Sequence, residues 1–124
     1  MAELSLSEFE ALVAQALAEL PEEIQQHLDN VAVAVAEWPS ARDRARAGAG
    51  HSGELFGLYE GVPLTERGHH YNLVPPDRIT IFRGPLQAAF RRDKALREQV
   101  RRTVVHEIGH HLGMSEARIR ELGY

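Results

Sequence analysis

Apolar residues recur at helical spacing near the start of the chain, and this spacing predicts an N-terminal helix with one apolar face. The residues on that face are Phe9, Leu12, Val13, Ala16, Leu17 and Leu20. Ser5 and Glu8 have the spacing of a capping box at the start of the helix. Pro21 suits the first turn of a second, short helix that runs to about Leu28.

Three later segments have the character of β-strands. Residues 31–38 begin with an alternation of valine and alanine. Residues 55–60 combine aliphatic and aromatic side chains, and residues 78–83 are rich in β-branched residues. Gly84-Pro85 ends the last of these segments and begins a short helix to about residue 91. The pattern predicts a small sheet of about three strands.

Residues 39–54 separate the first two predicted strands and are rich in Arg, Ala, Gly and Ser, which predicts a mobile loop. Arg42, Arg44 and Arg46 either contact an acidic partner or form a solvated charge run, and short charge runs are usually solvated.

The longest helix is predicted over residues 93–112, with Asp93 as a candidate cap. Its apolar residues lie four apart and form one buried stripe, made of Leu96, Val100, Val104, Ile108 and Leu112. Gly113 is the residue type that takes the left-handed turn at a helix end. Ser115 is then placed to cap a last short helix that runs to about Leu122.

The composition is that of a globular protein with one domain, residues 1–124. The formal charge of −4 gives no general attraction to nucleic acid or to an anionic membrane. The absence of cysteine excludes disulfides and a zinc site made of thiolates, so any metal must be held by His, Asp or Glu. The sequence has neither a membrane-spanning apolar run nor a signal-peptide pattern at its start, so we expect a cytoplasmic protein.

His106 and His110 are four residues apart on the long predicted helix. Four residues turn an α-helix by about 400°, so both imidazoles leave the same face, one turn apart, and suit two ligands of one zinc ion. Glu107 lies close to that face. In the zinc-protease motif a glutamate at this position is a general base that acts on water at the zinc and is not a ligand.

A catalytic zinc site usually has three protein ligands, so another residue must return to the metal. Gly113 permits the turn and Glu116 follows it, and we predict Glu116 as the third ligand. Glu121, or His69 and His70 from a loop, are alternatives. His69, His70 and Tyr71 are also candidate donors to a transition-state oxyanion, although an ordinary loop is the simpler interpretation.

The segment 103–115, Thr-Val-Val-His-Glu-Ile-Gly-His-His-Leu-Gly-Met-Ser, resembles the core of a family of short bacterial zincin-like metallopeptidases. Residues 58–64 and 79–86 extend the resemblance. It implies an α+β fold of the minimal zincin type, in which a small mixed sheet packs on the helix with the two histidines. Members usually carry Asp where Glu116 stands. Only eight residues follow Glu116, so the Met-turn of a true metzincin is not expected.

The resulting hypothesis is a peptidase that uses Zn²⁺ and Glu107 to hydrolyse a peptide or protein substrate. One alternative is a zinc-binding regulatory or interaction module that hydrolyses nothing. Another is a metal-dependent ribonuclease, which the acidic Glu107 and Glu116 and the negative net charge disfavour. Residues 42–46 are its only support.

Overall fold

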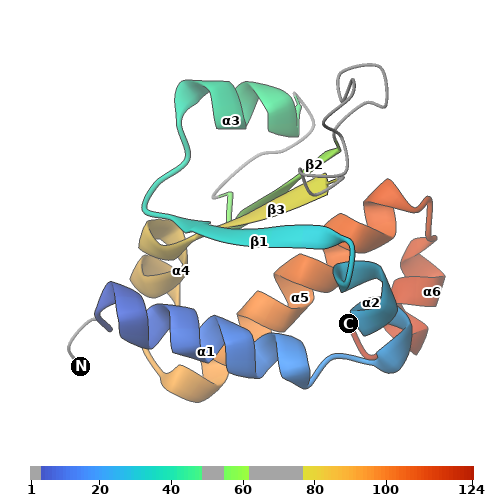
Figure 1. The fold of residues 1–124 in the computed structure, drawn as a ribbon, viewed down its shortest axis with the longest axis horizontal. Helices are drawn as coiled ribbons and strands as arrows, with labels where there is room; N and C mark the ends of the chain where they lie inside the picture. Colours follow the sequence, from blue (N-terminus) through green and yellow to red (C-terminus); the bar gives the residue numbers. More distant parts are fainter. Residues whose placement is uncertain (1–3, 49–54, 62–76) are drawn as a thin grey trace.

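The computed structural model describes residues 4–48, 55–61 and 77–124. In these ranges the chain forms both helices and strands, as the α+β prediction requires (Figure 1). The elements in chain order are α1 Leu6–Ala18, α2 Glu22–Leu28, β1 Val31–Ala36, α3 Ala41–Ala47, β2 Gly57–Gly61, β3 Asp77–Phe82, α4 Arg83–Ala89, α5 Asp93–His111 and α6 Glu116–Glu121.

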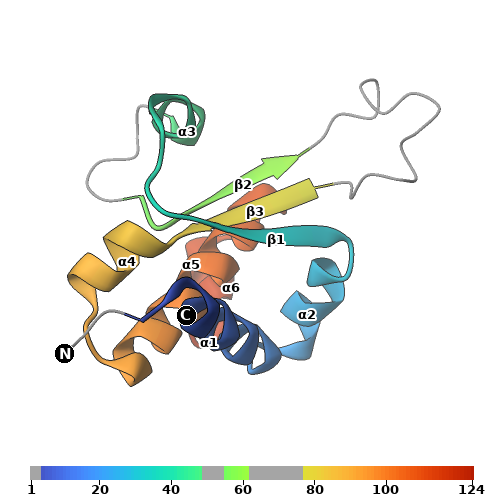
Figure 2. The same cartoon turned by 60° about the vertical axis from the view of Figure 1, so that its left-hand side comes forward.

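Among the described residues the sheet has three strands, in the order β1-β3-β2. β3 lies in the centre, parallel to β1 and antiparallel to β2. The predicted small mixed sheet is therefore confirmed. One face of the sheet is covered by α1, α2 and α5, while α3 lies on the opposite side (Figure 2).

The main core lies between α1, α5 and the sheet. Ile79 and Ile81 of β3 are completely buried there together with Phe9 of α1. A second, smaller cluster on the α3 side contains Leu55, Leu58 and Phe82. Because successive side chains of a strand point to opposite faces, β3 contributes isoleucines to one cluster and Phe82 to the other.

The long helix α5 and the strand β2 pack in a matching register. Three residues that lie four apart on α5 meet β2 in chain order: Thr103, Glu107 and His111. Thr103 lies at Gly57, where an added Cβ would be 2.7 Å from Thr103 Cγ2. His111 lies at Gly61, where an added Cβ would be 3.5 Å from His111 Cε1. Between them, Glu107 Oε1 accepts a hydrogen bond from the Tyr59 amide. Four helical residues rise about 6 Å and two strand residues about 6.7 Å, so the two elements stay in step.

Several helix-end predictions are confirmed. Ser5 and Glu8 form the capping box of α1. Gly113 has φ 76° directly after α5, and Ser115 Oγ accepts a hydrogen bond from the Arg118 amide at the start of α6. Within the described ranges, no helix is both long enough and apolar enough to cross a membrane.

The prediction of a loop over residues 39–54 is wrong for its first half, where α3 forms. Ser40 and Asp43 make a reciprocal capping box, and the Ala and Arg residues that follow favour a helix. The glycines that suggested a loop begin only at Gly48, the C-cap of α3. Residues 49–54 lie outside the described part.

Two details at the ends of α5 also differ from the prediction. The cap is Arg92, without a side-chain hydrogen bond, and Asp93 lies in the first turn. Leu112, predicted as the last member of the buried stripe, is 43% exposed. The helix ends at His111 and the chain turns at Gly113, so Leu112 lies beyond the part of α5 that the sheet covers.

Gly57→Ala should destabilise the protein by about 1–3 kcal/mol, because the new Cβ would overlap the Thr103 methyl group. Thr103→Ser removes that methyl but keeps the hydroxyl that accepts a hydrogen bond from Gln99. In a urea-unfolding cycle, we expect the double variant to be more stable than the sum of the single variants implies. Strictly additive losses would show that this contact does not set the distance between β2 and α5.

Candidate metal centre

His106 and His110 project from the same side of α5, where their ring centroids lie 5.9 Å apart. This stripe lies next to the stripe of Thr103, Glu107 and His111 that contacts β2, because each residue turns the helix by about 100°. The imidazole of His110 is largely exposed, while His106 is half-buried. The two rings therefore border the edge of the core and can be reached from solvent.

The turn after α5 brings Glu116 back to these rings. Gly113 adopts the left-handed conformation and the Met114 amide donates to the Gly109 carbonyl, which closes the helix end. The next helix, α6, is fixed by Ile119, which is completely buried in the main core. As a result Glu116, in the first turn of α6, places Oε1 3.1 Å from His110 Nε2.

Donor atoms of His106, His110 and Glu116 all lie within 4.8 Å of one another. Ligands about 2.0–2.2 Å from a tetrahedral zinc ion are about 3.3–3.6 Å apart, so a small inward movement satisfies this geometry. The hydrogen bond with His110 lowers the pKa of Glu116 below its ordinary value, so the side chain is a carboxylate at neutral pH. Two imidazoles and one carboxylate also form a set of donors that zinc accepts.

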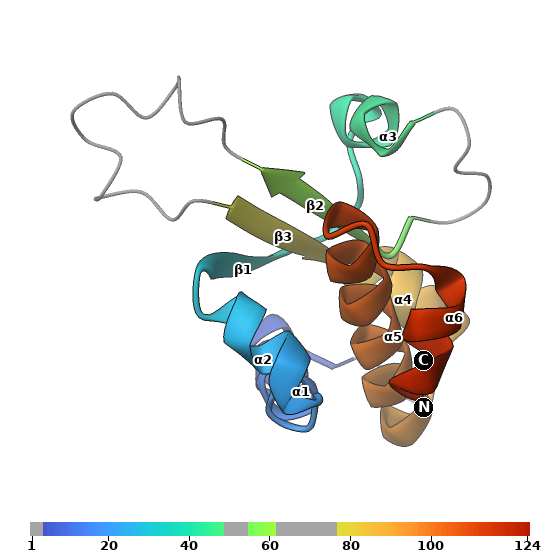
Figure 3. The ribbon, with the colours of Figure 1, turned by 90° about the vertical axis from the view of Figure 1, so that its right-hand side faces the viewer.

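A main-chain oxygen borders this group on one side. The Tyr124 oxygen lies 3.2 Å from His106 Nε2 and accepts a hydrogen bond from Arg102 at 3.1 Å. The segment after α6 is held to that helix through the Tyr124 amide and the Ile119 carbonyl. This segment therefore packs beside His106, and Figure 3 shows the C-terminus next to α5 and α6.

Glu107 is held on the opposite side, next to β2. Its Oε1 accepts the Tyr59 amide at 2.9 Å. Phe82 donates its amide to the Phe56 carbonyl, so these two residues form a hydrogen-bonded pair. Hydrogen-bonded and non-hydrogen-bonded pairs alternate along antiparallel strands. Tyr59, three residues after Phe56, is therefore in a non-hydrogen-bonded pair and directs its amide away from β3. The carboxylate of Glu107 thus lies at the outer edge of the sheet, where Glu107 lines one cavity together with His110.

Tyr59 and Asp77 were not selected from the sequence, although they form part of this environment. The Tyr59 hydroxyl donates to Asp77 Oδ2, and its ring stacks on His111 with centroids 4.1 Å apart. His111 Nε2 lies 3.7 Å from the same Asp77 oxygen. Burial, followed by the hydrogen bond to Asp77, raises the pKa of Tyr59, so the hydroxyl remains a donor. No local spacing marks Tyr59 and Asp77 as site residues, because they meet His111 only through the pairing of β2 with β3 and the packing of α5 on β2.

Two cavities flank the Tyr59–His111 stack. The first, of about 290 Å³, is lined by Glu107, His110 and His111 of α5, Leu58 and Tyr59 of β2, and Arg46 of α3, among others. The second, of about 270 Å³, includes Asp77, Asn30 and Leu112 in its lining. Tyr59 and His111 line both cavities and therefore separate them.

The remaining site predictions have different outcomes. Glu121, the alternative ligand, lies 4.0 Å from Arg118 and is not part of the group of possible metal ligands. Met114 packs against the main core. His69, His70 and Tyr71 lie outside the described residues, so their proposed roles stay predictions.

Residues 28–124 match a family described as zincin-like metallopeptidase. The chain belongs to this family. The match includes the whole sheet, α5 with its histidines and α6 with Glu116. A comparison with curated proteins finds no match. Membership in the zincin-like family agrees with the α+β architecture and with the three possible ligands.

Glu116→Gln should weaken zinc binding at least about tenfold, since the loss of even an outer-shell partner of a metal site costs about 10–100-fold. Glu121→Gln is the matched control on the same helix and should bind zinc like the wild type. Competition with a chromophoric chelator measures both affinities, and circular dichroism checks the fold. Equal affinities in the two variants would remove Glu116 from the ligand set.

Proposed function

We propose that this zincin-like protein is a zinc-dependent metallopeptidase in which His106, His110 and Glu116 hold the metal and Glu107 is the general base. The observation that carries the proposal is the grouping of the three donors within 4.8 Å, with Glu107 on the neighbouring stripe of the same helix. The family match over residues 28–124 supports the same reaction class.

Bound zinc supplies a Lewis acid that polarises a peptide carbonyl and lowers the pKa of water towards about 7. Glu107 takes the proton of the attacking water and transfers it to the leaving amine. Its carboxylate suits this role because Tyr59 N–H holds one oxygen in place at 2.9 Å. A base that is already oriented does not have to be ordered during the reaction, which lowers the entropic cost of reaching the transition state.

The open edge of β2 is the proposed binding site for a peptide. β2 pairs only with β3 among the described strands. Phe56 and Phe82 form a hydrogen-bonded pair, and hydrogen-bonded pairs alternate with non-hydrogen-bonded pairs along β2 and β3. The main-chain groups of Gly57, Tyr59 and Gly61 therefore point away from β3. The Tyr59 amide is already donated to Glu107, so an extended peptide would add to this edge through the Tyr59 carbonyl and the main-chain groups of Gly57 and Gly61. Its backbone would then pass beside Glu107.

Glu107→Gln should retain zinc and lose about 10²–10⁴-fold in the rate of peptide hydrolysis, because an amide cannot accept the proton. The matched control is Glu98→Gln, an exposed glutamate on the same helix that pairs with Arg101. Mass spectrometry of a peptide library digested by the zinc-loaded proteins gives the rates, and elemental analysis gives the zinc content.

Two outcomes of this experiment would contradict the proposal. Full activity in Glu107→Gln would remove Glu107 as the base. Zinc-loaded wild type that cleaves none of a broad library would favour the alternative of a zinc-binding module that hydrolyses nothing.

A further inference from the structure

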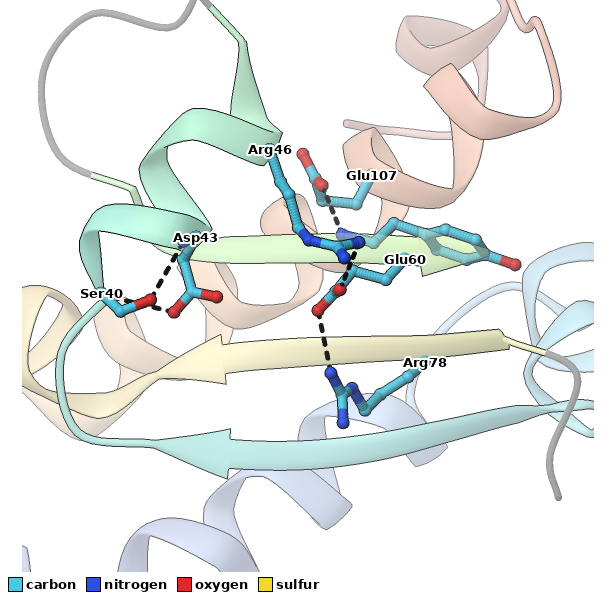
Figure 4. Close-up of polar contacts among 7 residues, drawn as sticks. Ser40, Asp43, Arg46, Glu60, Arg78 and Glu107 are labelled. Carbon is cyan, nitrogen blue, oxygen red and sulfur yellow. Dashed lines mark hydrogen bonds and ion pairs between the residues drawn. The ribbon is translucent and has the colours of Figure 1, made fainter. Parts of the chain in front are cut away.

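Arg46 brings a positive charge from α3 to the cavity beside Glu107. Its Nη1 lies 2.8 Å from Glu60 Oε2, and its side chain is still 43% exposed. Arg46 and Glu107 line the same cavity of about 290 Å³. Figure 4 shows Arg46 extending from α3 towards β2, while Glu107 approaches β2 from α5. The cation therefore lies in the cavity where the proposed reaction takes place.

Glu60 does not cancel this charge, because it is shared with a second arginine. Arg78 Nη2 lies 3.0 Å from Glu60 Oε1, so the charged triad of Arg46, Glu60 and Arg78 has a net charge of +1. Glu60 is the inner member, with 15% exposure against 43% for Arg46. A guanidinium has five N–H donors, more than one carboxylate can accept. Arg46 can therefore keep its contact with Glu60 and receive another carboxylate.

From this arrangement we infer that Arg46 is a specificity-determining residue that binds a carboxylate of the peptide substrate. The inference rests on the proposed function and adds a substrate class to it, peptides with a carboxylate on the α3 side of the cleft. Two sources can supply this group, an Asp or Glu side chain and the peptide C-terminus. An Asp or Glu side chain is the favoured source, because an extended peptide can present side chains at any point along its length, whereas it has one C-terminus.

The position of this carboxylate follows from strand geometry. Leu58 and Glu60 point to the face of the sheet that carries α3, because Leu58 packs with Phe82 and Ala47 in the second cluster. A peptide paired with the edge of β2 presents alternate side chains on that face. Residues directly opposite each other in an antiparallel pair have Cβ atoms about 4.5–5.5 Å apart. An acidic side chain opposite Glu60 would be repelled by that carboxylate, and the guanidinium of Arg46, 2.8 Å from Glu60 Oε2, is the cation in position to offset the repulsion.

A purely structural role is the competing explanation, since Arg46–Glu60 also ties α3 to the sheet. Two substitutions that each remove one charge distinguish these explanations, because they should change the preference for acidic peptides in opposite directions if Arg46 binds substrate. Arg46→Gln and Glu60→Gln both break the ion pair, so both should act alike if only the attachment of α3 matters. If Arg46 binds substrate, the first lowers the triad charge from +1 to 0 and the second raises it from +1 to +2.

The test uses synthetic peptide pools of matched composition. One pool contains internal Asp or Glu and an amidated C-terminus, the second is the same pool with the side-chain carboxylates methyl-esterified, and the third has no acidic residue but a free C-terminus. Affinity is measured with zinc-loaded Glu107→Gln protein, and kcat and KM with proteins that retain Glu107. Arg44→Gln is the matched control, because Arg44 is exposed and lies two residues from Arg46, about 200° around α3.

We expect wild type to prefer the acidic pool over its ester by about tenfold, the size of a partly solvated, charge-assisted contact. Arg46→Gln should abolish the preference mainly through KM, Glu60→Gln should increase it, and Arg44→Gln should leave it unchanged. Preference for the third pool in place of the first would assign the C-terminal carboxylate as the source. The preference should weaken as salt increases.

A wild type without preference, or without binding to any pool, would overturn the inference. So would equal losses in Arg46→Gln and Glu60→Gln, which would leave Arg46 as a structural contact only. Failure of the proposed function has a different signature. In that case acidic peptides would bind in an Arg46-dependent manner, and wild-type protein would cleave none of them.

Discussion

The site depends on the fit between one stripe of α5 and the outer strand β2. Thr103, Glu107 and His111 advance by one helical turn each while β2 advances by two residues, and these distances are nearly equal. The strand can approach because Gly57 has no Cβ where Thr103 packs. Leu96, Val100 and Val104, buried in the main core, fix the rotation of the helix about its axis. Once this rotation is set, Glu107 must meet β2 and His106 and His110 must lie on the adjacent stripe.

The third possible ligand is placed by a short local path. Only Leu112, Gly113, Met114 and Ser115 lie between α5 and α6, and each has a defined contact or conformation. Burial of Ile119 in the core then prevents α6 from moving away. The three possible metal ligands therefore lie on two consecutive helices, α5 and α6, which this turn joins. The proposed base, Glu107, is oriented instead by β2, a strand that is distant in sequence. Because of this division, we expect substitutions to separate metal binding from catalysis.

The same division explains what could be predicted from the sequence. The buried stripe of α5, the turn at Gly113 and the cap at Ser115 follow from local periodicity and local hydrogen bonds, so they were predicted with the histidines they position. The contacts of Tyr59 with Glu107, Asp77 and His111 depend on strand pairing, and no local pattern encodes them. α3 was missed although Ser40 and Asp43 carry a capping signal, because the glycines that follow dominated the interpretation of that segment.

β2 connects the two proposed properties of the site because its residues alternate between faces. Tyr59 offers its amide to Glu107 and its ring to His111, whereas the next residue, Glu60, points to the α3 side and pairs with Arg46. A peptide added to the edge of β2 would alternate in the same way. Its backbone would pass the base while its side chains on one face would meet Arg46. Arg46 belongs to α3 and pairs with Glu60, whereas the three possible metal ligands belong to α5 and α6. Its substitution should therefore alter which peptides bind and leave those three ligands in place.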